Sequence, residues 1–163
     1  MRERFVAGSI GPSGRLPSAD DPDLSNVTFA ELADVFREQA IGLIRGGVDL
    51  LLIETSQDIL EVKAAITGIQ KAFVETGASL PIQAQVTLDT TGRMLLGTDM
   101  AAALTILEGM PIDGIGLNCS TGPEHMRELF RRPAERGQEK HFGFRFDPGV
   151  LREEDVGVRS DVR

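Results

Sequence analysis

The sequence of 163 residues predicts an α/β fold made of about four parallel β/α units. Short runs of apolar and β-branched residues alternate with amphipathic helical patterns, which is typical of parallel β/α architecture. The run Val48–Glu54 is apolar almost throughout, as expected for a strand that is covered on both faces. The composition, 41% hydrophobic and 26% charged, is that of an ordinary globular domain that can bury a core.

The first unit consists of a strand, a long loop and a helix. Phe5–Ile10 predicts the strand. Residues 11–26 are rich in Pro, Gly, Asp and Ser, so turns should dominate there and no regular element is expected. Thr28 and Glu31 have the spacing of a capping box, in which the hydroxyl and the carboxylate satisfy backbone donors at a helix start. The glycine pair at 46–47 predicts the end of that helix.

The remaining units follow in the same order. The predicted elements are a strand at Val48–Glu54, a helix from Asp58 to a stop at Gly77, a strand at Pro81–Leu88, a helix at about Thr98–Glu108 and a strand at Gly114–Asn118. A second capping box, at Thr121 and Glu124, predicts a last helix that runs to about Arg131. Because helices separate the strands, the strands are expected to lie parallel in one sheet.

The chain changes character after about residue 130. Residues 1–130 are expected to form the folded unit, and residues 131–163 a divergent, loosely ordered tail. The last dozen residues of the tail carry too few apolar side chains to offset the entropy lost on ordering them. The alternation at Phe142–Phe146 allows one strand within this segment.

The charge balance excludes some classes of partner. The chain has 25 acidic and 17 basic residues, a net charge of -8, so neither nucleic acid nor an anionic membrane surface is an expected partner. The first residues show no apolar signal region, and no apolar stretch is long enough to cross a bilayer. A cytoplasmic location is therefore expected.

Candidate site residues follow the predicted strands, because ligands of parallel β/α folds bind at the carboxyl ends of the strands. The segments of interest are 9–12, 54–55, 87–89 and 118–119. Glu54 ends a very apolar strand, where a carboxylate needs a cation, hydrogen-bond donors or water. Two interpretations stay open for it: recognition of a substrate ammonium group, or a structural carboxylate that is solvated at the rim or bonded to a neighbouring backbone.

Cys119 is the only cysteine and follows the fourth predicted strand. It is a candidate thiolate ligand of zinc, although a buried and inert thiol is the commoner state of a free cysteine. His125 and His141 show no metal-binding spacing and are expected at the surface. The pair Gly114 and Gly116 lacks the third glycine of a dinucleotide-binding loop, so no nucleotide site is predicted.

Several of these segments resemble one known family. Val6–Pro12, Val48–Thr55 with Asp58, Gln85–Arg93, and Gly116–Cys119 followed by Gly-Pro-Glu look like the homocysteine S-methyltransferase domain of cobalamin-dependent methionine synthases. The resemblance covers roughly Phe5–Leu129, about four-fifths of the chain. It implies a partial (β/α)8 TIM barrel, of which the chain would hold strands three to six, with residues 1–130 as the partial homocysteine-binding barrel.

The resemblance also implies a function and roles for residues. The family transfers a methyl group to the thiol of homocysteine, which zinc presents as a thiolate, and forms methionine. By family resemblance Cys119 is the first of three zinc ligands, Glu54 holds the amino group of homocysteine, and Ser9, Gly11 and Asn118 are further substrate-binding candidates. A free thiol has a pKa of about 8.5, so coordination to zinc supplies the thiolate needed for attack.

The chain also departs from the family. The remaining zinc ligands of the family are an adjacent Cys-Cys pair, which this sequence lacks, so its zinc site is incomplete. Cobalamin and methyltetrahydrofolate belong to other domains of the full-length enzyme. Activity would then need the rest of the barrel from a complementing chain, and open sheet edges favour self-association. One alternative is an inactive remnant or interaction module that retains part of the barrel without catalysis. Another is a betaine or S-methylmethionine type of methyltransferase, although Gln85–Arg93 favours the cobalamin-dependent branch.

Overall fold

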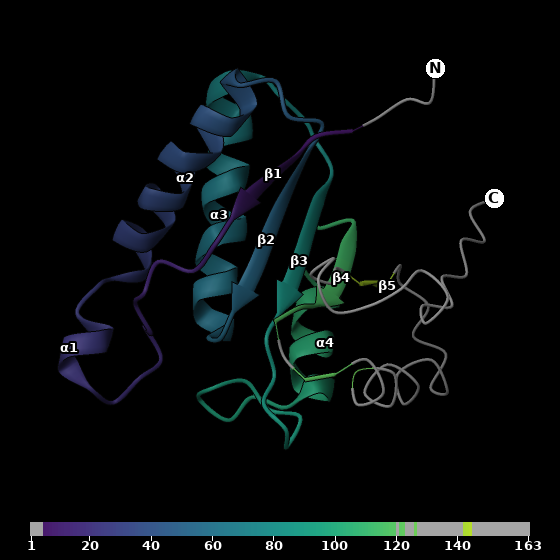
Figure 1. Ribbon diagram of the computed structural model, residues 1–163. Coiled ribbons are helices and arrows are strands. Elements are labelled where there is room, and N and C mark those ends of the chain that lie inside the picture. The colour runs from purple at the N-terminus through teal and green to yellow at the C-terminus, as the bar shows by residue number, and fades with distance from the viewer. Residues whose placement is uncertain (1–4, 120, 123–125, 127–141, 145–163) are drawn as a thin grey trace.

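The computed structural model describes residues 5–119, 121–122, 126 and 142–144. The elements alternate as the sequence predicts: β1 (Ala7–Ile10), α1 (Pro22–Ser25), α2 (Phe29–Arg45), β2 (Leu50–Ser56), α3 (Ile59–Thr76), β3 (Ile82–Val86), α4 (Met100–Glu108), β4 (Gly114–Leu117) and β5 (Phe142–Phe144). The described strands form one sheet in the order β1-β2-β3-β4-β5, and neighbouring strands pair in parallel (Figure 1). The predicted α/β fold class is confirmed.

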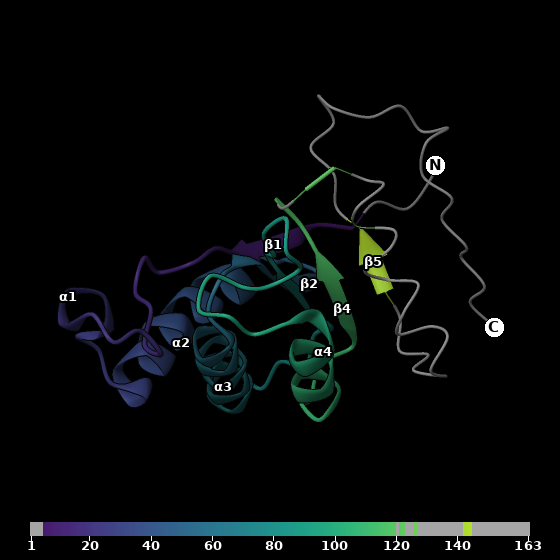
Figure 2. The ribbon, with the colours of Figure 1, turned by 90° about the horizontal axis from the view of Figure 1, so that it is seen from below.

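The helices α2, α3 and α4 lie on one face of the sheet, as Figure 2 shows. Alternate residues of each strand face these helices, because side chains alternate across a strand. The helix-facing residues form the apolar core with the inner sides of the helices: Ile10, Leu51, Ile53, Ile82, Ala84, Val86, Ile115 and Leu117. The other residues of the strands, among them Ser9, Glu54 and Gln85, therefore belong to the opposite face.

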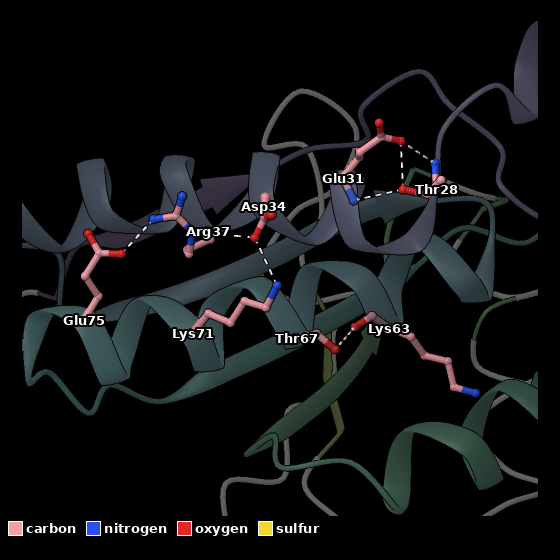
Figure 3. A network of polar contacts seen from close by, with 8 residues as sticks. All are labelled: Thr28, Glu31, Asp34, Arg37, Lys63, Thr67, Lys71 and Glu75. Atoms are coloured by element: carbon pink, nitrogen blue, oxygen red, sulfur yellow. Dashed lines mark hydrogen bonds and ion pairs between the residues drawn. The ribbon is translucent and has the colours of Figure 1, made fainter.

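The helices α2 and α3 pack closely against each other. Gly68 of α3 lies against the backbone of α2: a Cβ built on it would come within 2.4 Å of the Ala33 carbonyl oxygen and 2.8 Å of the Arg37 nitrogen. On the exposed side of the same pair, Arg37 bonds to Glu75 at 2.7 Å (Figure 3). Such exposed ion pairs contribute little to stability, so the close apolar contact decides how the two helices pack.

Most predicted boundaries lie within a few residues of the observed ones, and the helix ends agree best. Thr28 and Glu31 form the predicted capping box, with the Glu31 nitrogen 3.2 Å from the Thr28 hydroxyl (Figure 3). Gly77 ends α3 in the left-handed conformation, with φ 71°. Strands β1 and β3 are shorter than predicted, whereas β2 begins two residues later and continues past Glu54 to Ser56.

One expectation for the long loop was wrong. Residues 11–26 were expected to hold no regular element, but Pro22–Ser25 form the single-turn helix α1. Asp21 caps it through a side chain that accepts from the Asp23 nitrogen, and proline suits the first position of a helix because the missing N–H would have no partner there. The turn residues thus support a short helix as well as turns.

Part of the predicted C-terminal region lies outside the described residues. Among these are Glu124 of the second capping box, His125, His141 and most of the tail at 131–163. Within the tail the structure describes β5, which coincides with the predicted strand at Phe142–Phe146. In the described part of the chain, no helix has the length and apolar character needed to span a membrane.

Two buried carboxylates attach the long loop to the start of α3. Glu61 accepts bonds from the nitrogen and hydroxyl of Ser13, at 2.8 and 2.6 Å. Asp58, which caps α3 through the Leu60 nitrogen, also accepts from the nitrogen and hydroxyl of Ser18, at 2.8 and 2.7 Å. The loop that follows β1 is therefore held beside the carboxyl edge of the sheet.

Glu61→Gln is expected to change how stability depends on pH. Burial raises the pKa of Glu61 above its ordinary value of 4.5, and the bonds from Ser13 only partly oppose this. The folded protein then holds this proton more tightly than the unfolded chain, so Glu61 lowers stability progressively as the pH rises above 4.5. Relative to the wild type, the Gln variant should gain stability over that window, as measured by urea unfolding at a series of pH values.

Glu31→Gln is the matched control for this measurement. Hydrogen bonds from the backbone and hydroxyl of Thr28 lower the pKa of the Glu31 carboxyl, so its contribution has the opposite sign. Removal of the Glu31 carboxylate should therefore lower the free energy of unfolding more above its ordinary pKa of 4.5 than below it. If the free energies of unfolding of the wild type and Glu61→Gln changed with pH in parallel, Glu61 would have no effect on the pH dependence of stability.

Candidate functional site

The carboxyl end of β2 departs from regular strand geometry at Glu54 and Thr55. Ile53 pairs with Ala84 and Ser56 with Val86, so three steps along β2 match two along β3. This is a β-bulge, a device that redirects side chains and is frequent beside functional sites. Thr55 at the bulge has φ 61°, in the left-handed region. Glu54 lies within this irregular stretch, so the bulge affects the direction of its side chain.

Asn118 connects this bulge to the end of β4. Its Oδ1 accepts from the Thr55 nitrogen at 2.9 Å, and its Nδ2 lies 2.8 Å from the Thr55 hydroxyl oxygen. The same Nδ2 is 3.2 Å from Glu54 Oε2 and 3.5 Å from Cys119 Sγ. Asn118 is 2% exposed, and the Thr87 hydroxyl donates to its carbonyl oxygen. One buried carboxamide thus brings together the carboxylate and the thiol.

The residues of β1 that the sequence nominated lie at the same edge. The Ser9 hydroxyl donates to Glu54 Oε1, on the oxygen that Asn118 does not contact. Gly11 follows β1 directly, and a Cβ built on it would meet nothing within 4 Å. Hydrogen bonds therefore link Ser9, Glu54, Asn118 and Cys119, whereas Gly11 lies at the rim with open space beside it.

Cys119 is exposed at the tip of β4. The interpretation of this thiol as buried was therefore wrong. Its backbone has φ 50°, and the Thr55 hydroxyl donates to its sulfur at 3.6 Å. The thiol can be reached from outside while its sulfur is fixed by contacts on the protein side.

The donors described at this edge do not make a complete zinc site. Within the ranges that the structure describes, no three His, Cys, Asp or Glu side chains gather closely enough to hold a metal ion. Catalytic zinc normally takes three protein ligands, of which sulfur and nitrogen are preferred. Cys119 supplies one sulfur, so further ligands would have to come from other residues.

Two threonines also contribute to this site. Sequence analysis placed both at the ends of strands but assigned them no role. Thr55 bridges Asn118 and Cys119, and Thr87 holds the carbonyl of Asn118. Their positions just after strands were a signal for attention, but nothing local indicates which distant group each one meets. Buried Gln85 on β3 was likewise unassigned, and its Oε1 has no hydrogen-bond partner among the residues that the structure describes.

The segment 89–99, part of which carries the family resemblance, forms a compact hairpin after β3. Asp89 Oδ1 accepts from the nitrogen and hydroxyl of Thr91, at 2.8 and 2.7 Å, and from the Arg93 nitrogen at 3.2 Å. These bonds, chiefly the one from the Thr91 hydroxyl, lower the pKa of the Asp89 carboxyl. Gly92 has φ 78°, which suits glycine. The motif Asp-Thr-Thr-Gly-Arg is thus explained by a turn beside the site.

Comparison with known proteins identifies the family. The family model for homocysteine S-methyltransferases matches residues 1–154, which extends past Leu129, where the sequence resemblance was expected to end. The chain is 45% identical over 134 residues to a methionine synthase of Mycobacterium tuberculosis, covering 80% of this chain and 11% of that protein. It is 42% identical over 129 residues to a methionine synthase of Mycobacterium leprae, covering 79% of this chain and 10% of that protein.

A solved structure agrees in fold. The apo crystal structure of a homocysteine methyltransferase from Escherichia coli superposes with a TM-score of 0.60 at 22% identity, over 78% of this chain and 44% of that one. The chain thus spans less than half of this homocysteine methyltransferase and about a tenth of the methionine synthases it matches. From the family match over 1–154, the chain belongs to the homocysteine S-methyltransferase family.

Proposed function

We propose that this chain supplies the homocysteine-binding part of an enzyme that transfers a methyl group to the thiol of homocysteine and forms methionine. In this proposal Glu54 holds the ammonium group, Ser9 and Asn118 orient Glu54, and Cys119 stands where the substrate sulfur is activated. The observation that carries the proposal is the Asn118 carboxamide, whose nitrogen lies 3.2 Å from the Glu54 carboxylate and 3.5 Å from the Cys119 sulfur. Homocysteine carries an ammonium group at one end and a thiol at the other, so a carboxylate and a sulfur held by one carboxamide suit its two ends.

Glu54 is suited to bind an ammonium group. It is only partly exposed, and Ser9 and Asn118 each contact a different oxygen of its carboxylate, so its orientation is set before a ligand arrives. A hydrogen bond between ionised partners is stronger than a neutral one, and pre-oriented groups lose less entropy on binding. Glu54 can therefore supply much of the affinity for the amino end of the substrate.

Zinc is the metal that we propose for activation of the thiol, with Cys119 as one ligand. When bound, zinc would hold the substrate sulfur as a thiolate. The described residues do not complete its ligand set, so we assign to this chain the binding and orientation of homocysteine and no step of the transfer itself. The additional ligands and the methyl donor would come from other parts of a full-length enzyme.

A second candidate function is an inactive remnant or interaction module. It is favoured by the incomplete set of metal donors among the described residues. In that case the arrangement of Glu54, Asn118 and Cys119 would persist without ligand binding. Direct measurement of homocysteine binding separates the two candidates.

Homocysteine should bind to the isolated chain, and Glu54→Gln should weaken that binding. Loss of one charge-assisted hydrogen bond is worth about 1.5–3 kcal/mol, which corresponds to a rise in Kd of roughly 10- to 100-fold. Titration calorimetry or amide chemical-shift changes measure the Kd. Glu75→Gln is the matched control, because Glu75 pairs with Arg37 on the outer side of the helices, and it should leave the Kd unchanged.

Two results would refute the homocysteine proposal. Failure of the wild-type chain to bind homocysteine would favour the remnant, provided that the chain unfolds cooperatively in urea. Equal affinities for the wild type and Glu54→Gln would show that the chain binds homocysteine without any contribution from Glu54.

A further inference from the structure

Two residues other than glycine occupy the left-handed backbone region at the carboxyl edge of the sheet. Thr55 has φ 61° and Cys119 has φ 50°, and among the described residues the other positive φ values belong to glycines. This region is unfavourable for residues with a Cβ, and a β-branched residue such as threonine is especially unsuited to it. The two residues follow Glu54 and Asn118 directly, so the strained backbone coincides with the proposed site.

The hydroxyl of Thr55 connects these two positions. It accepts from Asn118 Nδ2 at 2.8 Å and donates to Cys119 Sγ at 3.6 Å. The Thr55 nitrogen donates to Asn118 Oδ1 at 2.9 Å, so the carboxamide holds both the backbone and the side chain of this residue. Thr55 is thereby kept in its unfavourable conformation by the same group that contacts Glu54 and the sulfur.

A bulge alone does not require a threonine. Glycine adopts positive φ without strain, and asparagine does so more easily than most residues. A structure selected only for the bulge would be better served by either of them. What threonine adds at this position is a hydroxyl that reaches the Cys119 sulfur, and strain retained at a site is a feature of functional positions.

We infer that Thr55 is a positioning residue, whose hydroxyl, fixed by Asn118, holds the Cys119 sulfur at its set place beside the Glu54 carboxylate. This inference deepens the proposed function and rests on it for its biological meaning. Thr55 touches neither substrate nor metal in this role; it acts through Cys119. The backbone strain at Thr55 is retained because the hydroxyl contact requires the side-chain direction that the left-handed conformation produces.

Three substitutions at this position separate the hydroxyl from the strain. Thr55→Val keeps the branched shape and removes the hydroxyl. Thr55→Ser keeps the hydroxyl and removes the branch. Thr55→Gly removes the hydroxyl and relieves the strain, so its urea midpoint should exceed that of Thr55→Val.

The position of the sulfur is read from the rate of alkylation of Cys119 by iodoacetamide. Cys119 is the only cysteine, so the reaction reports on one atom, and all variants are compared at one and the same pH. Loss of the hydroxyl contact should raise the rate constant at least about three-fold in Thr55→Val and Thr55→Gly. Thr55→Ser should stay within about two-fold of the wild type.

Homocysteine binding provides the second measurement. Its Kd should rise at least about five-fold in Thr55→Val and stay near the wild-type value in Thr55→Ser. A purely structural role would alter the urea midpoint but change the alkylation rate constant of Thr55→Val by less than about three-fold. That result would overturn the inference. If the wild-type chain binds no homocysteine, the proposed function fails, whereas the alkylation rates still decide whether Thr55 positions the sulfur.

Discussion

Replacement of Gly68 by alanine is expected to lower the free energy of unfolding by about 3 kcal/mol. The new Cβ would lie 2.4 Å from the Ala33 carbonyl oxygen, 2.8 Å from the Arg37 nitrogen and 2.9 Å from Phe36 Cβ. Two of these atoms are backbone, so no side-chain rotation can make room and α2 must move away from α3. Because α2 and α3 bury Leu32, Phe36 and Ile66 between themselves and the sheet, the movement loosens the main core. Urea unfolding of the purified chain measures the loss.

Gly42→Ala is the control for that substitution. Gly42 also lies inside a helix, but a Cβ built on it would meet nothing within 4 Å. Alanine is favoured over glycine in a helix by about 1 kcal/mol, so this variant should be slightly more stable than the wild type. Similar stabilities for Gly42→Ala and Gly68→Ala would contradict the close approach of α2 and α3.

Asp58→Ala is expected to have a comparably large effect, about 3 kcal/mol. Asp58 is 1% exposed and accepts three hydrogen bonds: one from Leu60 that caps α3 and two from Ser18 of the long loop. Truncation removes the cap and also leaves the Ser18 donors without this acceptor, which is more costly than removing both partners of a bond. Urea unfolding again provides the free energy.

Asp99→Ala separates the cap from the loop attachment. Asp99 caps α4 through the Ala102 nitrogen at 2.9 Å, and its side chain is 48% exposed. Its loss should cost only about 1 kcal/mol, the usual contribution of a cap. Released loop residues should also be cleaved by trypsin at Arg15 faster in Asp58→Ala than in Asp99→Ala. Equal cleavage rates would show that Asp58 does not hold the loop.

Helix ends could be predicted from sequence because their causes are local. The capping box of Thr28 and Glu31 operates within a single turn, and Gly77 ends α3 by its own backbone conformation. The prediction failed at Pro22–Ser25, where the same Pro, Asp and Ser residues that form turns also form a one-turn helix. Short-range preferences therefore located the long elements better than the short one.

The candidate site could be nominated from sequence but not assembled. Glu54 and Cys119 were named because they follow strands and match a family pattern. The Asn118 carboxamide that joins them bonds to a residue 63 positions earlier in the chain, and no local pattern reports such a contact. Thr55 was noticed at a strand end and within a motif but was given no role, because its conformation and its reach to the sulfur depend on the bulge in β2.

The sequence by itself determined the alternation of strands and helices, the helix caps and the family, since periodicity, capping and motif order are properties of neighbouring residues. Tertiary structure alone decided that Asn118 contacts Glu54, Thr55 and Cys119 together, that Gly68 lies against α2, and that the long loop is attached through Asp58 and Glu61. The physical reason is that parallel strands bring their carboxyl ends to one edge only when the sheet forms. Register and bulge then set which side chains meet there.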